Sequence, residues 1–156
     1  MNNEYMEKIH FVPLLASAAL TTSIVFSKGV KMSNYRWCTF LVHLGVCDTI
    51  GTITVYESTS AATGSAITMP FYYRLADTVG VDALGASTSC ASTGVTYALQ
   101  GTGTAYVVDV DPATMTDGYT YLRVCITPSG TNSSSIIGVD ALLDPKYLGK
   151  TPISSV

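Results

Sequence analysis

From residue 35 onward, apolar and polar residues alternate with a period of two, in short runs separated by Gly, Ser, Thr, Asp and Pro. This alternation is typical of β-strands, in which successive side chains point to opposite faces of the sheet. The runs are rich in β-branched and aromatic residues, which strands favour. The pattern predicts eight main strands, at 9–12, 23–26, 35–46, 50–58, 67–75, 104–110, 119–127 and 136–143, and a weaker ninth at 95–99.

The connections carry further signals. Residues 47–49 are short enough for a hairpin between their flanking strands. Pro70 cannot donate to a ladder, so the first half of its strand is expected at an edge or a bulge. The stretch 76–103 is rich in Gly, Ser and Thr and too long for an ordinary hairpin loop, which indicates a surface excursion. Helical turns are expected only at 111–117 and 13–19.

These elements define the expected fold class as all-β, a jelly-roll-like antiparallel β-sandwich. The length of 156 residues suits a single domain over 1–156. A short N-terminal arm is expected at about 1–8 and an extended C-terminal arm at about 144–156, where prolines follow the last predicted strand.

Charged residues make up only 12% of the chain and hydrophobic residues 47%, which excludes a disordered acidic or basic tail. The net charge is −3 and the eight basic residues are scattered, so no stripe for direct nucleic-acid binding is present in the sequence. No apolar run reaches the roughly 18 residues of a membrane-spanning helix. A surface with so few charges predicts contacts with neighbouring subunits, and therefore a homo-oligomer.

The four cysteines show neither a CxxC motif nor a Cys/His grouping at metal-ligand spacing. Three of them lie in apolar runs, so we expect reduced thiols in the core or an interface rather than disulfides. Residues 11–20 imitate the apolar part of a signal peptide, but Glu4, Glu7 and Pro13 argue against cleavage. Assembly in a cytoplasm is the consistent expectation.

The sequence offers little reactive chemistry, and we expect no enzyme, no cofactor and no metal. His10 and His43 lie in strand-like apolar surroundings and are interpreted as structural imidazoles. Asp109, Asp111 and Asp117 are interpreted as turn caps, with calcium as the alternative. The aromatic residues are assigned to the core or to interfaces, with carbohydrate stacking as the alternative.

Seven segments follow one another along the chain, namely KIHFVP (8–13), GVKMSNY (29–35), GTITVYE (51–57), YYR (72–74), YVVDVD (106–111), GYTYLRV (118–124) and LLDPKY (142–147). Together they resemble a family of small tailed-bacteriophage structural proteins, the capsid decoration or cement proteins. The resemblance implies a jelly-roll-like sandwich that binds the outside of the major-capsid lattice, often as a trimer, and has no catalytic residues. It implies a virion protein of the outer capsid surface, assembled in the host bacterial cytoplasm.

The expected partners are the major capsid protein and further copies of the chain. Contact with the partner is expected at the start of the C-terminal arm, at Asp144, Pro145, Lys146, Tyr147 and Leu148. The alternatives are a fimbrial or adhesin-like sandwich, a carbohydrate-binding sandwich, and a phage tail or baseplate subunit.

Overall fold

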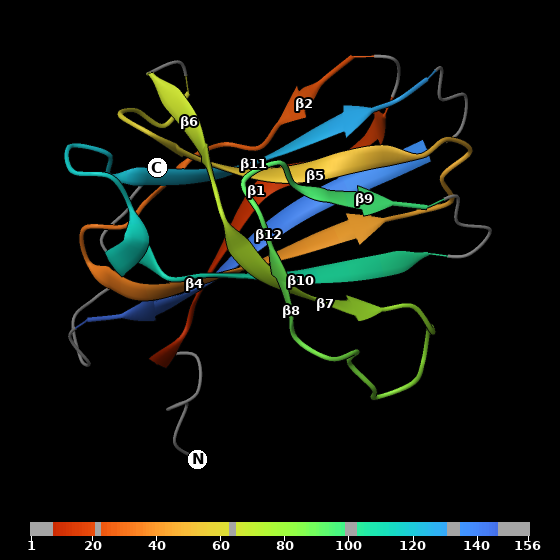
Figure 1. Ribbon diagram of the computed structural model, residues 1–156. Helices are drawn as coiled ribbons and strands as arrows, with labels where there is room; N and C mark the ends of the chain where they lie inside the picture. The colour runs from red at the N-terminus through yellow and green to blue at the C-terminus, as the bar shows by residue number, and fades with distance from the viewer. Residues whose placement is uncertain (1–7, 21–22, 63–64, 99–102, 131–134, 147–156) are drawn as a thin grey trace.

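The computed structural model describes residues 8–20, 23–62, 65–98, 103–130 and 135–146, which form a β-sandwich (Figure 1). Within these ranges the chain forms twelve strands and a single-turn 3-10 helix, η1. They are β1 (His10–Leu20), β2 (Val25–Phe26), β3 (Val30–Lys31), β4 (Tyr35–Leu44), β5 (Gly51–Ser58), β6 (Ala66–Met69), β7 (Phe71–Ala76), β8 (Thr88–Cys90), β9 (Val95–Tyr97), β10 (Thr104–Val110), η1 (Pro112–Thr114), β11 (Tyr121–Pro128) and β12 (Ser135–Pro145).

The strands form two antiparallel sheets. Sheet A has the order β1-β12-β4-β10-β7-β8, and sheet B has the order β2-β11-β5-β6, with β3 beside β11 and β9 beside β5. Leave aside β3, β7, β8 and β9, and number the other eight strands from 1 to 8 in chain order, so that β1 is 1, β2 is 2, β4 is 3, β5 is 4, β6 is 5, β10 is 6, β11 is 7 and β12 is 8. Sheet A then contains the order 1-8-3-6 and sheet B the order 2-7-4-5, which is the jelly-roll arrangement. The predicted fold class is therefore confirmed.

The hairpin predicted at 47–49 is wrong. The strand before it, β4, pairs with β10 and β12 in sheet A, whereas β5 pairs with β11 in sheet B. The link instead crosses between the sheets and is held by the start of β12, where the Ser135 hydroxyl accepts from the Asp48 amide at 3.2 Å and donates to the Asp48 carboxylate at 3.0 Å. A link this short can join two packed sheets as well as two strands of a hairpin, so its length alone does not distinguish the two.

The predicted strand 67–75 is in fact two strands. β6 pairs with β5 in sheet B, and β7 pairs with β10 in sheet A. Pro70 lies between them. Proline has no amide hydrogen to donate to a strand ladder, and at this position, outside both strands, no such bond is needed. The expected edge position is confirmed for β6, which ends the strand order of sheet B.

The helical turn expected at 13–19 is also wrong, because β1 continues to Leu20. Pairing with β12 overrides the helix propensity of the alanines, and two register shifts accommodate the irregular segment. The turn expected at 111–117 is confirmed as η1. The 76–103 excursion contributes β8 and β9 to the two sheets, and residues 77–89 within it are exposed.

The core consists of side chains that point inward from both sheets. Each large aliphatic side chain buried in this way stabilises the fold by about 1.5–3 kcal/mol. All four cysteines are buried and free, as predicted. The fully buried large side chains include Phe40, Val42, Leu44, Ile53, Val55, Tyr97, Leu122, Ile126, Ile137 and Leu143. Among the described residues, no helix has the length and apolar character needed to cross a membrane.

Candidate interaction surfaces

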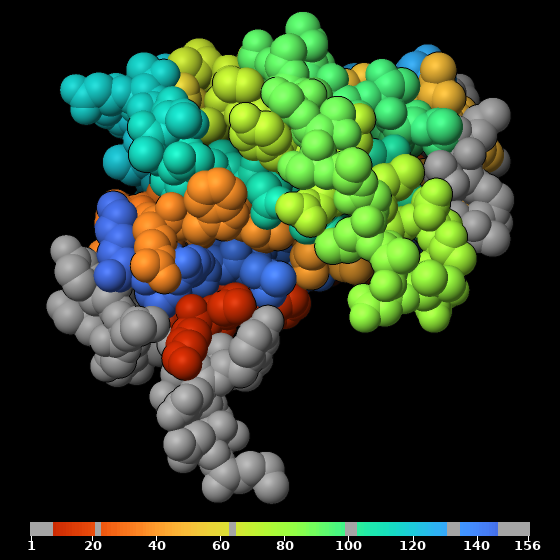
Figure 2. All heavy atoms as spheres, turned by 60° about the horizontal axis from the view of Figure 1, so that its bottom comes forward, coloured from red at the N-terminus to blue at the C-terminus, as the bar shows by residue number. Residues whose placement is uncertain are grey.

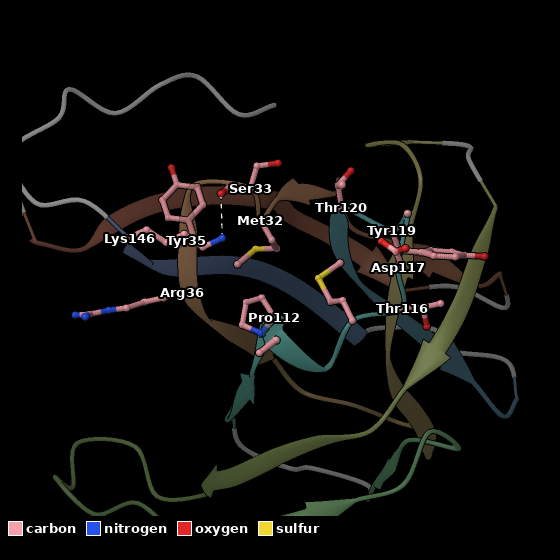
Figure 3. Close-up of a pocket in the computed structure, with 13 residues that line it drawn as sticks. Met32, Ser33, Tyr35, Arg36, Pro112, Thr116, Asp117, Tyr119, Thr120 and Lys146 are labelled. Carbon is pink, nitrogen blue, oxygen red and sulfur yellow. Dashed lines mark hydrogen bonds between the residues drawn. The ribbon is translucent and has the colours of Figure 1, made fainter.

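A pocket of about 420 Å³ opens at one end of the sandwich, between the turn that leads into β4 and the loop that contains η1 (Figure 3). Its apolar residues include Met32, Tyr35, Pro112 and Met115. Met32 is buried, and Met115 is half-buried against the core. We call this the methionine pocket; Figure 3 shows Lys146 on one side of it and Asp117 on the other.

The loop on one side of the pocket is fastened by two acidic residues. Asp111 caps η1, since its carboxylate accepts from the Ala113 amide at 2.9 Å, which confirms the interpretation of this residue as a turn cap. Glu57 on β5 is only 3% exposed and accepts from the amide and the hydroxyl of Thr116, at 2.7 and 2.5 Å. This role of Glu57 was not predicted from the sequence, although the spacing of Glu57 from Ile53 and Val55 places all three on one face of the strand.

The expected partner-binding residues fall into two groups. Asp144 and Pro145 belong to β12, which is longer than predicted, so the extended arm does not begin at 144. Pro145 is buried, and Asp144 accepts from the Arg36 guanidinium at 2.6 Å. Lys146 is exposed; its amide donates to the Asn34 carbonyl at 2.8 Å and its ammonium to the Ser33 carbonyl at 3.1 Å.

The remaining partner-binding residues, Tyr147 and Leu148, lie outside the described residues, as do residues 1–7 of the expected N-terminal arm.

The histidines are oriented by neighbouring side chains. His10 Nδ1 lies 3.1 Å from the Tyr35 hydroxyl, with the rings edge to face. His43 Nε2 lies 3.7 Å from an oxygen of Asp140. These contacts agree with structural roles for both imidazoles. Across the described part of the chain, no group of three or more His, Cys, Asp and Glu side chains is placed to hold a metal ion.

Asp109 has a hydrogen-bond partner on the neighbouring strand and does not cap a turn. It lies on β10, and its carboxylate accepts from the Thr39 hydroxyl of β4 at 2.6 Å. The two residues are direct cross-strand neighbours, so the bond adds to the pairing of the central strands. The reading of Asp109 as a turn cap is therefore wrong.

The cysteine thiols are poorly suited to nucleophilic chemistry. Burial raises the pKa of each of the four thiols, and it raises the pKa of Cys38 well above its ordinary value. Since the thiolate is the reactive form, these side chains behave as small apolar residues.

The outer face of sheet A carries aromatic side chains on several strands. Phe11, Trp37 and Tyr72 are 50%, 39% and 54% exposed. Figure 2 shows this side of the molecule, where β1 (red), β12 (blue) and β4 (orange) follow one another in the order of the sheet. A hollow of about 270 Å³ lies beside Trp37, with Lys8 and Asp144 among its lining residues.

The outer face of sheet B differs in chemistry, because it presents hydroxyls. Thr52 and Tyr56 on β5 are half-buried there, and Thr68 on β6 is exposed. The Arg123 guanidinium lies 4.6 Å from the centre of the Phe26 ring and donates to the Ala62 carbonyl at 2.6 Å. This face is thus partly covered by the chain itself, whereas the aromatic side chains of sheet A remain open.

The excursion after β7 is a further apolar surface. Val79, Val81 and Leu84 are 77%, 55% and 53% exposed. These three side chains lie close together in sequence, on a segment between β7 and β8 that belongs to neither sheet.

Comparison of the chain with protein-family models, with curated proteins and with solved structures gives no match.

Proposed function

We propose that the protein is a structural virion protein, a capsid decoration or cement protein that binds the outer surface of the major-capsid lattice and stabilises a phage head. It acts as a homo-oligomer, most simply a trimer, without catalysis and without a cofactor. The order of the resembling segments supports this proposal, and so does the jelly-roll strand order.

The observation that most strongly supports the proposal is the amount of apolar surface exposed to solvent. Among the described residues, twelve large apolar side chains, distributed over both sheets and the connections, are 39–77% exposed. The whole chain has only eight basic and eleven acidic residues to keep such a surface soluble. Open apolar surface on several sides suits a subunit that has neighbours on several sides. Many weak contacts on a lattice add up through high effective concentration.

A second candidate function is carbohydrate binding on sheet A. Trp37 is open to solvent beside a hollow whose lining includes Lys8, Thr39 and Asp144. An aromatic platform with polar neighbours is the chemistry that stacks and orients a sugar ring.

The test is binding of the purified protein to capsids that lack it, followed by sedimentation and measurement of the copy number. We expect saturable binding with a copy number comparable to that of the major capsid protein, and a higher temperature of capsid disruption. Absence of binding to capsids, together with retention on a glycan array that Trp37→Ala abolishes, would favour the second candidate.

The apolar excursion supplies a matched pair of variants for this test. Val79→Ser removes the most exposed large apolar side chain, and Thr78→Ser beside it changes an exposed residue without removing apolar surface of that size. If the excursion contacts the lattice, Val79→Ser weakens binding and Thr78→Ser does not. Equal binding of both variants would place the contact elsewhere.

A further inference from the structure

Four neighbouring strands of sheet A carry a row of outward side chains whose charges are arranged end to end. The row runs across β12, β4, β10 and β7 and consists of Asp140, Leu41, Val107 and Arg74, each the cross-strand partner of the next. The residues before and after each of them lie in the core or pack against it, so these four side chains lie on the outer face. The row has an acid at one end, a base at the other and two aliphatic side chains between them.

The two charges cannot neutralise each other within one chain. Three strand spacings of about 4.8 Å place Arg74 about 14 Å from Asp140, beyond the reach of the two side chains. Arg74 is exposed and forms no hydrogen bond or ion pair with a described residue. Asp140 is partly exposed, and its carboxylate lies 3.7 Å from His43 Nε2, too far for a hydrogen bond. Both charges are therefore available to a second molecule.

A second copy of the chain supplies both missing partners. Two copies can face each other about a two-fold axis that runs along the strands, midway between β4 and β10, so that each row lies reversed over the other. Arg74 of each copy then lies over Asp140 of the other, across a gap of about 10 Å between packed sheets. A two-fold axis across the strands would instead stack acid on acid and base on base, so the charges select the first axis.

The neighbouring row agrees with the same axis. It consists of Leu142, Thr39, Asp109 and Tyr72 on the same four strands. The axis brings Leu142 of one copy over the Tyr72 ring of the other, which is 54% exposed. It also brings Thr39 over Asp109, a hydroxyl over a carboxylate. We propose that the outer face of sheet A binds a second copy of the chain about this axis, with an ion pair between Arg74 and Asp140 on each side of an apolar centre.

The size and the anatomy of the face suit a stable pair. The strands of sheet A are 3–11 residues long and cover on the order of 700 Å², at about 3.3 Å per residue and 4.8 Å per strand. Each partner of a standard protein interface buries about 800 Å². An apolar centre with charged groups toward the rim is the usual arrangement of such an interface.

The inference rests on the self-association that the proposed function includes, and on no contact with a capsid. A two-fold contact closes with two copies. The three-fold contacts of the proposed trimer would therefore use other surfaces, and the two kinds of contact together give six copies.

The experiment compares the charge reversals Arg74→Asp and Asp140→Arg by sedimentation velocity and native mass spectrometry. Either variant alone places like charges over each other at both ends of the row, so we expect the dissociation constant of the pair to rise at least about 100-fold. An equimolar mixture of the two variants again places an acid over a base at both ends. Mixed pairs should therefore form with nearly the wild-type affinity, which also shows that both variants fold.

Lys31→Asp is the matched control, because it makes the same change of charge as Arg74→Asp at an exposed residue of sheet B. It should leave the dissociation constant unchanged. The proposal is overturned if the wild type does not associate in multiples of two, or if the mixture of the two reversed variants forms no mixed pairs. Pairing without capsid binding supports this inference and contradicts the proposed function, whereas capsid binding without pairing does the reverse.

Asp109 supplies a variant with the opposite effect. The two Asp109 side chains of a pair flank the axis in the same row, so their like charges oppose association. Asp109→Asn removes this repulsion and keeps an oxygen that accepts from the Thr39 hydroxyl. We expect the dissociation constant to fall several-fold, and a rise would overturn the proposed axis.

Discussion

Thr116→Val should destabilise the protein through the buried carboxylate of Glu57. That carboxylate is 3% exposed and accepts two hydrogen bonds from Thr116, of which the valine variant retains only the one from the amide. A hydrogen bond to a charged group contributes about 1.5–3 kcal/mol. Thr116 itself is exposed, so water reaches its side of the bond, and we expect the lower part of this range, about 2 kcal/mol.

Urea denaturation at neutral pH measures the loss directly, and thermal unfolding should show a decrease of about 4–8 °C for a chain of this length. Thr114→Val is the matched control, because the Thr114 hydroxyl donates to the Asp111 carbonyl at 2.8 Å in the same loop but in an exposed position. We expect the control to change the free energy of unfolding by less than about 0.5 kcal/mol. Equal effects of the two variants would refute the reasoning that Glu57 fastens the loop.

Four further predictions concern the core, the thiols and the C-terminus. Tyr97→Phe should raise the free energy of unfolding by about 1 kcal/mol, because the buried hydroxyl has no hydrogen-bond partner among the described residues. A lower free energy of unfolding for the variant, measured by urea denaturation, would show that the hydroxyl has a partner. Burial raises the pKa of Tyr97 to about 12, above its ordinary value of 10.0. The free energy of unfolding of the wild type should therefore fall as pH rises from about 10 to 12, because the unfolded chain loses the Tyr97 proton first. Tyr97→Phe should lack this part of the pH dependence, and identical pH profiles of the two proteins would contradict the raised pKa. The four cysteines should resist a thiol reagent in the native protein and all react after denaturation, whereas fewer than four would reveal a disulfide. A chain ending at Lys146 should remain folded and bind capsids more weakly in the sedimentation assay, and undiminished binding would remove residues 147–156 from the proposed contact. The cut follows Lys146 because Asp144 and Pro145 belong to β12.

Only part of the candidate site could be predicted from the sequence. Asp111 was identified as a cap, since capping is a local interaction between a side chain and the backbone two residues on. The methionine pocket was not found, because Met32 and Met115 are far apart in the chain and meet only when β4 packs beside the η1 loop. The role of Glu57 likewise depends on Thr116, which lies 59 residues away.

The sequence by itself indicated most of the strands, but not residues 13–20 of β1, and neither β3 nor β8. Alternation with a period of two records the two faces of a strand locally, and the interruption at Pro70 follows from the chemistry of one residue. The tertiary structure decided which sheet each strand joins. The link 47–49 crosses the sandwich and β6 and β7 part at Pro70 because strand pairing is a contact between distant segments, which no local pattern contains. For the same reason residues 13–19 are strand rather than helix, since their partner is β12 at the other end of the chain.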